Sequence, residues 1–140
     1  MINLSPQEAY NELSYYTLSH SSTGFIHQLI VDAFAAQTAD KNTKPIKITF
    51  ALVGLYLVVE KGFTGKQVQL AHMKLARNRK EWLTFTLPEN RDNITVFDVL
   101  SKSPGKQRDE MIHKWCDAVW ETYKDSQQQV RDFVKKELGI

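Results

Sequence analysis

The segment at residues 48–59, ITFALVGLYLVV, places the strongest constraint on the fold because it carries no charge and almost no polar group. Its twelve residues are too few to span a bilayer, since a membrane helix needs about 20. They also exceed the roughly 5–6 residues of a usual strand. We therefore predict a buried helix over residues 46–59, which Pro45 opens and Gly62 ends. The β-branched side chains of this segment leave a strand as the alternative.

Other segments show apolar residues at helical spacing, preceded by residues that begin helices. Capping-box pairs occur at Ser5 and Glu8, Thr64 and Gln67, and Thr95 and Asp98. The expected helices cover about residues 6–18, 25–39, 46–59, 64–78, 95–101 and 105–138. The chain has 140 residues and shows no internal repeat and no linker. We therefore predict an all-α fold in a single domain over residues 1–140, a bundle of about five main helices around the apolar helix at 46–59.

Composition and cysteine content indicate a cytoplasmic globular protein. Hydrophobic residues make up 42% of the chain and charged residues 24%, which is ordinary for a folded soluble domain. Cys116 is the only cysteine, so the chain can form no internal disulfide and suits a reducing compartment. The first ten residues, MINLSPQEAY, lack the basic and apolar layout of a secretory signal. We expect a cytoplasmic location and no membrane partner.

The net charge of +2 hides an uneven distribution along the chain. Residues 1–40 carry −4, residues 41–80 carry +8 and residues 81–140 carry −2. One interpretation is that the acidic N-terminal helices lie beside the basic middle helix, because charge runs often form solvated faces. The other interpretation is a surface that binds anions.

The second interpretation makes the basic segment a candidate binding site for nucleic acid or another polyanion. The side chains that could contact phosphates are Lys66, Lys74, Arg77 and Lys80. Trp82 follows them and could stack on a base, although a tryptophan in such a run also serves to anchor a loop to the core. The small total charge argues against a nucleic-acid partner.

Polar side chains near the inner faces of the expected helices are the candidate site residues. In the helix at 25–39, a turn of about 100° per residue puts His27 and Gln37 near the apolar stripe. The same spacing puts Asp32 on the opposite, solvated side. His72 lies on the apolar stripe of its helix, and Glu60 ends the buried helix. We therefore expect His27, Gln37, Glu60 and His72 to line a polar ligand pocket. Asp32 joins these candidate ligand-binding residues only through the resemblance described below.

Three of these residues could bind a metal. The imidazoles of His27 and His72 with the carboxylate of Glu60 form a workable ligand set for a divalent ion such as zinc or iron, and helical bundles build such sites from facing helices. The alternative is that each is a buried polar group satisfied by a hydrogen bond, from His27 to Gln37 or a main-chain carbonyl, and from His72 to Glu60.

The segments FIHQLIVDAFAAQ, ITFALVGLYLVVEKGFTGKQVQLAHM, ITVFDVL and IHKWCDAVWETY resemble an uncharacterised family of small bacterial proteins, a domain of unknown function. The resemblance covers about residues 10–135 and brings no assigned activity. It implies that His27, Asp32 and Gln37 are family hallmarks, as is the tryptophan-rich last helix. Larger relatives begin with a CxxC segment, which this chain lacks, and Gln127 stands where a histidine is expected. Both departures weaken a metal site carried over from the family.

Three functional hypotheses remain open from the sequence, and whether the protein is an enzyme is not decided. The first is a bacterial cytoplasmic domain that binds a small ligand or a protein partner through a polar pocket near His27. The second is a metal-dependent enzyme with a His/His/Glu site between helices. The third is a polyanion binder that uses residues 61–80. An exposed apolar helix stripe could also pair two subunits in a homodimer.

Overall fold

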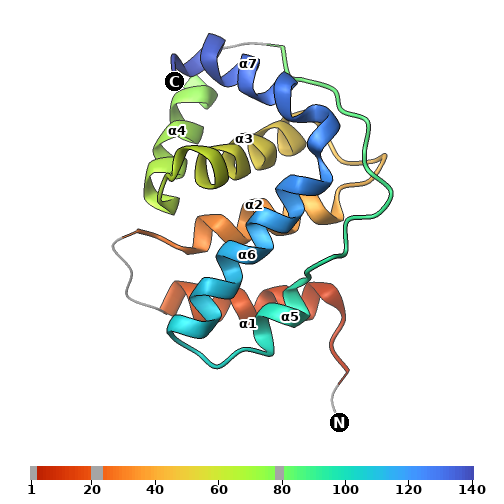
Figure 1. The fold of residues 1–140 in the computed structure, drawn as a ribbon, viewed down its shortest axis with the longest axis vertical. Helices are drawn as coiled ribbons and strands as arrows, with labels where there is room; N and C mark the ends of the chain where they lie inside the picture. The colour runs from red at the N-terminus through yellow and green to blue at the C-terminus, as the bar shows by residue number, and fades with distance from the viewer. Residues whose placement is uncertain (1–2, 20–23, 78–80) are drawn as a thin grey trace.

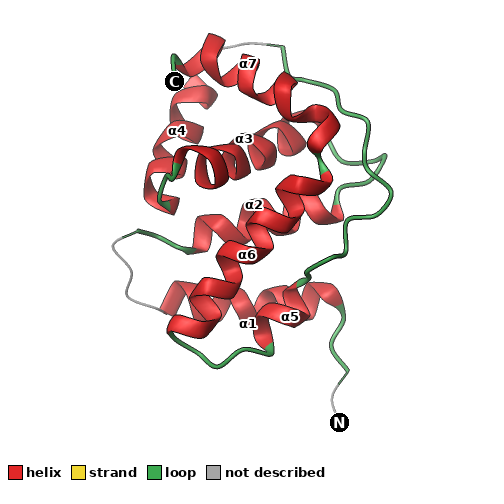
Figure 2. Ribbon diagram, in the orientation of Figure 1, coloured by secondary structure: helices red, strands yellow, loops and turns green. Residues whose placement is uncertain are grey.

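The computed structural model describes residues 3–19, 24–77 and 81–140, and this part of the chain folds into seven α-helices and one short 3₁₀-helix (Figure 1). The elements are α1 (Pro6–Ser19), α2 (His27–Thr38), α3 (Pro45–Lys61), α4 (Gly65–Arg77), α5 (Val96–Leu100), α6 (Lys106–Thr122), η1 (Lys124–Ser126) and α7 (Gln127–Leu138). The described ranges contain no β-strand (Figure 2), so the all-α prediction is confirmed.

α1 and α4 begin where the capping residues predict. At the start of α1, the Glu8 amide donates to Ser5 Oγ at 3.1 Å, and the Ser5 amide donates to Glu8 Oε1 at 3.0 Å. Thr64 and Gln67 make the same reciprocal pair before α4, at 3.2 and 2.8 Å. Each pair satisfies two main-chain N–H groups that the first turn of a helix leaves without a partner.

The apolar segment forms α3, so the helix prediction is correct and the strand alternative is wrong. Every residue from Ala51 to Val58 is buried. The helix packs against α2, α4, α6 and α7, which explains why none of its sides needs to be polar. It ends at Gly62, whose φ of 70° lies in the left-handed region and directs its N–H to the Leu57 carbonyl.

The last long helix expected over residues 105–138 is broken, and this prediction is wrong. α6 ends at Thr122, the turn η1 follows, and α7 begins at Gln127. Tyr123 is buried at the break, and its hydroxyl donates to the Ala36 carbonyl at 2.6 Å. The change of direction lets α7 pack against α3 and α4 while α6 packs against α2, α3 and α5.

The helices are arranged along an elongated body (Figure 1). α1 and α5 lie at one end, α4 and α7 lie at the other, and α6 runs between the two ends. α2 lies between α1 and the α3–α4 pair, and it contacts α1, α3, α4 and α6. Of the described helices, none is both long enough and apolar enough to cross a membrane.

Candidate functional site

Asp32 of α2 is buried, with only 4% of its surface exposed. The expectation of a solvated carboxylate is therefore wrong. The helical spacing assumed one buried face, but α2 is covered by α3 on one side and by α6 on another. The carboxyl group faces α3 at Gly54, where a Cβ atom would lie 1.9 Å from Asp32 Oδ2.

The carboxyl group of Asp32 is only partly satisfied by hydrogen bonds. Gln28 Nε2 donates to Oδ1 over a long distance of 3.3 Å. Oδ2 is buried and has no hydrogen-bond partner among the described residues. Burial raises the pKa of Asp32 well above its ordinary value, and the Gln28 hydrogen bond opposes this rise only in part. Burial thus favours the neutral carboxylic acid of Asp32 over its carboxylate in the folded chain.

A cavity of about 270 Å³ lies beside Asp32, between α2, α3 and α4. Its walls are mostly apolar, from Val31, Ala35, Ile46, Phe50 and Ala51. Its polar or charged lining residues are Gln28, Asp32, Lys47 and His72. We call this space the α2–α4 pocket. It brings together Asp32 and His72, two of the five residues that the sequence predicts for a ligand site.

His72 of α4 is half-buried against α3. Its Nε2 lies 2.8 Å from the Phe50 carbonyl, and its ring centroid lies 5.0 Å from that of Phe50. A carbonyl oxygen only accepts, so we assign the proton to Nε2, which makes Nδ1 of the neutral ring an acceptor. Burial lowers the pKa of His72, although the bond to the Phe50 carbonyl partly opposes this effect. His72 therefore favours the neutral form, as Asp32 does.

His27 begins α2 and is held by a different partner. Its Nδ1 lies 2.8 Å from Thr17 Oγ1 of α1, and burial lowers its pKa. His27 is not among the residues that line the α2–α4 pocket. The hydrogen bond expected between His27 and Gln37 is not what the structure shows.

Gln37 is a buried and fully bonded amide. Its Nε2 donates to the carbonyls of Arg91 and Ile94 at 2.6 and 2.7 Å. Its Oε1 accepts from Trp115 Nε1 at 3.0 Å. Gln37 therefore joins α2 to α6 and to the connector at residues 81–95, which agrees with the expectation that a buried polar group needs partners.

Glu60 is paired outside the pocket. Its carboxylate accepts from Arg131 at 2.7 and 2.9 Å and from Trp120 Nε1 at 2.8 Å. The hydrogen bonds from Arg131 lower the pKa of Glu60. The expected bond between Glu60 and His72 is thus replaced by contacts to α6 and α7.

The three candidate metal ligands, His27, His72 and Glu60, do not form one site. Within residues 3–19, 24–77 and 81–140, no group of three or more His, Cys, Asp or Glu side chains is placed to hold a metal ion. Each of the three candidates instead bonds to a separate neighbour. A divalent-metal site built from these residues does not fit this geometry.

The basic residues of the polyanion hypothesis lie on α4, except for Lys80, which falls outside the described residues. Lys66, Lys74 and Arg77 are exposed. Trp82 packs edge-on against Phe50, with ring centroids 5.3 Å apart. Polyanion binding by this segment stays a hypothesis.

Gly54 and the direction of Asp32 are the features of the site that sequence reasoning missed. The signal was present, because a glycine inside an otherwise apolar helix costs about 1 kcal/mol relative to alanine and usually has a packing reason. The helix at 25–39 carries a single carboxylate, Asp32. A packing reason for Gly54 could therefore have been sought in a contact with that side chain.

A family model described as "Family of unknown function (DUF5946)" matches residues 5–124. The chain belongs to this family. The resemblance to an uncharacterised domain is thereby confirmed. No curated protein and no solved structure matches the chain. The segment matched to DUF5946 contains every residue that lines the α2–α4 pocket, whereas α7 lies beyond it.

Proposed function

We propose that the protein binds a small, mainly apolar molecule carrying an amino group, in the α2–α4 pocket. The observation that carries this proposal is the buried carboxyl of Asp32 at the wall of an apolar cavity, with one oxygen lacking a hydrogen-bond partner among the described residues. A buried polar group without a partner is costly and calls for a specific explanation.

The size and lining of the pocket support a small ligand. A volume of about 270 Å³ lies just below the range of about 300–1,000 Å³ that is usual for ligand cavities, so only a small ligand fits. Phe50, Ile46 and Val31 would contact the apolar body of such a ligand, and removal of its surface from water would supply most of the binding free energy.

The polar groups of the pocket support a donor on the ligand. Asp32 as a carboxylate and Nδ1 of neutral His72 are both acceptors. An ammonium group near Asp32 would stabilise the carboxylate and so lower its pKa. Binding would then release the proton that Asp32 holds in the free protein. Lys47 lies at the exposed edge of the pocket.

NMR titration with benzylamine and with its neutral counterpart benzyl alcohol tests the proposal. We expect benzylamine to shift the amide signals of residues around Asp32 and His72 more strongly than the alcohol does. Asp32→Asn should weaken benzylamine binding by at least about tenfold, which is 1.4 kcal/mol. The matched control is Asp92→Asn in the exposed connector, which should leave binding unchanged. Equal binding of amine and alcohol, or equal binding by wild type and Asp32→Asn, contradicts the proposal.

Calorimetry in two buffers of different ionisation enthalpy gives a second readout. Proton release by Asp32 makes the apparent binding enthalpy depend on the buffer. We expect this dependence with benzylamine for the wild type and its loss in Asp32→Asn. A binding enthalpy that is the same in both buffers for the wild type argues against Asp32 as the contact.

A further inference from the structure

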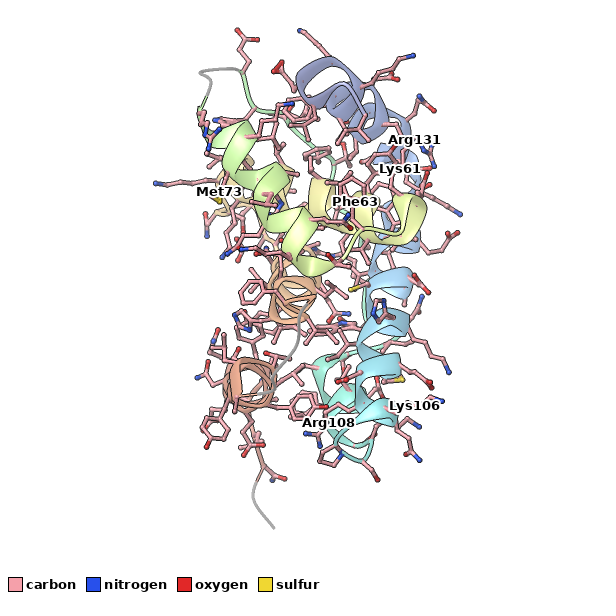
Figure 3. All side chains as sticks on the ribbon, turned by 90° about the vertical axis from the view of Figure 1, so that its left-hand side faces the viewer. Lys61, Phe63, Met73, Lys106, Arg108 and Arg131 are labelled. Carbon is pink, nitrogen blue, oxygen red and sulfur yellow. The ribbon has the colours of Figure 1, made fainter. Side chains whose placement is uncertain are left out.

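The outer face of α4 carries a row of cations around two exposed apolar side chains. At about 3.6 residues per turn, one stripe of this helix contains Lys66, Leu70, Met73, Lys74 and Arg77. All five are exposed, and 53% of Leu70 and 50% of Met73 face solvent. Met73 points away from the body of the molecule (Figure 3). We call this row the basic stripe.

The charges of the basic stripe are not neutralised within the described chain. α4 contains no acidic residue. Among the described residues, no ion pair joins Lys66, Lys74 or Arg77 to a carboxylate. Lys66 donates to Gln69 of its own helix at 3.2 Å. A face with exposed apolar groups and unpaired cations fits a partner that offers apolar groups and carboxylates.

The outer face of α1 has that composition. At the same helical spacing, one side of α1 contains Glu8, Glu12, Tyr15 and Leu18. Tyr15 is 78% exposed and Leu18 is 61% exposed. The capping bond from Ser5 lowers the pKa of Glu8, so its carboxylate is charged near neutral pH. We call this row the acidic stripe.

The two stripes lie on separate parts of one molecule. α1 packs against α2 and α5, whereas α4 packs against α2, α3 and α7. Figure 1 places α2 between α1 and α4. Of the two acidic N-terminal helices, α2 lies beside the basic helix α4 as one interpretation expected, but its one carboxylate, Asp32, is buried. α1 is not among the helices that pack against α4.

We propose that two copies of the chain associate by placing the acidic stripe of one copy on the basic stripe of the other. The two stripes match in length, because the ten steps from Glu8 to Leu18 and the eleven steps from Lys66 to Arg77 span about 15 and about 17 Å. We place the helices antiparallel with Glu8 opposite Arg77. Glu12, four residues after Glu8, then lies near Lys74, which is three residues before Arg77.

The same antiparallel register pairs the apolar side chains. Tyr15 follows Glu8 by seven residues, and Leu70 precedes Arg77 by seven residues. The register therefore sets Tyr15 opposite Leu70. Parallel helices would also set Glu8 beside a cation, Lys66. They would, however, place Tyr15 beside Met73 and Lys74, and Leu18 beside Arg77. In the antiparallel register both carboxylates meet cations, and Tyr15 meets Leu70, each the most exposed apolar residue of its stripe. Leu18 then lies opposite Gln67.

A hollow beside α1 gives room for the incoming side chains. It has a volume of about 750 Å³, and its lining includes Tyr15, Tyr16, Leu100 and Arg108. The Arg108 guanidinium lies 4.7 Å from the centre of the Tyr16 ring and donates to the carbonyls of Lys102 and Leu100. Arg108 is therefore occupied within its own chain. Met73 of the second copy would extend into this hollow.

Charge reversal on each stripe tests the association. In the wild type at low salt and millimolar protein, analytical ultracentrifugation should detect a self-associated species that salt dissociates. Glu8→Lys with Glu12→Lys should weaken self-association by at least about tenfold, and Lys74→Glu with Arg77→Glu should do the same. Each double variant alone places like charges against each other. An equimolar mixture of the two should associate again, because reversed acidic stripes then face reversed basic stripes.

Two controls separate this effect from changes of folding or total charge. Asp117→Lys with Glu121→Lys reverses two exposed acids four residues apart on α6 and should leave self-association unchanged. Glu8 also caps α1, so Tyr15→Ser provides a variant on the same stripe that keeps the cap. Tyr15→Ser should also weaken self-association, while thermal melts show that each variant is folded.

Several outcomes would overturn the proposal. One is a wild-type chain that remains monomeric at low salt and millimolar concentration. Another is a mixture of the two charge-reversed variants that fails to associate. A third is a monomeric wild type that binds a single-stranded RNA oligonucleotide through Lys74 and Arg77, which would identify a polyanion as the partner of the basic stripe.

Discussion

The carboxyl group of Asp32 fills the space where Gly54 has no side chain, because a Cβ atom at Gly54 would fall 1.9 Å from Oδ2 and 2.6 Å from the carboxyl carbon. The acid is short, and its own Cβ lies only 3.3 Å from the same point. Even if the carboxyl group rotated away, this tight contact with the Asp32 Cβ would remain. Asp32 and Gly54 together set how closely α2 approaches α3.

Gly54→Ala tests this relationship. The added methyl group should destabilise the wild type by about 1–3 kcal/mol, as overpacking does in other cores. In an Asp32→Ala background the same change should have little cost or a gain, because alanine is the better helix former by about 1 kcal/mol. Urea unfolding of the four chains in this double-mutant cycle measures the coupling. Equal effects of Gly54→Ala in both backgrounds would show that the two residues do not interact.

Asp32→Asn should change how stability depends on pH. Below the ordinary pKa of an aspartate, both folded and unfolded chains hold the proton at Asp32. As the pH rises above about 4, the unfolded chain releases this proton while the folded chain keeps it, so the free energy of unfolding falls by at most about 1.4 kcal/mol per pH unit. The amide of Asp32→Asn does not titrate. The free energy of unfolding of the variant should therefore increase relative to that of the wild type as the pH rises.

The measurement is urea unfolding of both proteins at several values from about pH 4 to about pH 7. Other groups titrate equally in both chains, and any change in hydrogen bonding at position 32 adds an offset that does not vary with pH. Parallel stability curves would mean that the carboxyl group is ionised in the folded protein.

Gln37→Ala should destabilise the fold by about 1–3 kcal/mol, because it leaves buried partners without a hydrogen bond. The groups affected are Trp115 Nε1 and the carbonyls of Arg91 and Ile94. The matched control is Gln128→Ala, since Gln128 is exposed on α7; its effect should stay within about 0.5 kcal/mol. Thermal unfolding of both variants makes the comparison. Similar small losses of stability would show that the hydrogen bonds of Gln37 do not stabilise the fold.

Cys116 should be unreactive toward a thiol reagent in the folded protein. Its side chain is fully buried, and burial raises the pKa of its thiol, which suppresses the nucleophilic thiolate. We expect its reaction rate with a disulfide reagent to follow unfolding as urea is added. A Gln128→Cys variant in a Cys116→Ser background should react at once, and equally fast labelling of native Cys116 would show that the core opens locally.

Local sequence signals predicted the starts of helices well. Ser5 with Glu8 and Thr64 with Gln67 act within one turn, so their effect does not depend on the rest of the chain. The buried helix α3 was also predictable, since a long run without polar groups leaves no side of a helix for solvent.

Features that depend on two or more helices were not predictable from one periodic pattern. A helical wheel with one buried side placed Asp32 in solvent, but α2 is covered on two sides. The break at Tyr123 has no glycine or proline to mark it and is instead fixed by a hydrogen bond to Ala36, which is 87 residues away. His27, His72 and Glu60 each face inward or bond to neighbours, yet their partners come from three different places in the fold.

The connector at residues 81–95 has no regular structure (Figure 1), and side chains of distant helices hold its main chain in place. Gln37 bonds to the carbonyls of Arg91 and Ile94, and Gln129 of α7 bonds to that of Thr84. The connector can take this path only once α2 and α7 have reached their final positions. Its native path therefore depends on residues far away in the sequence, and we expect the connector to become ordered only after α2 and α7 have packed.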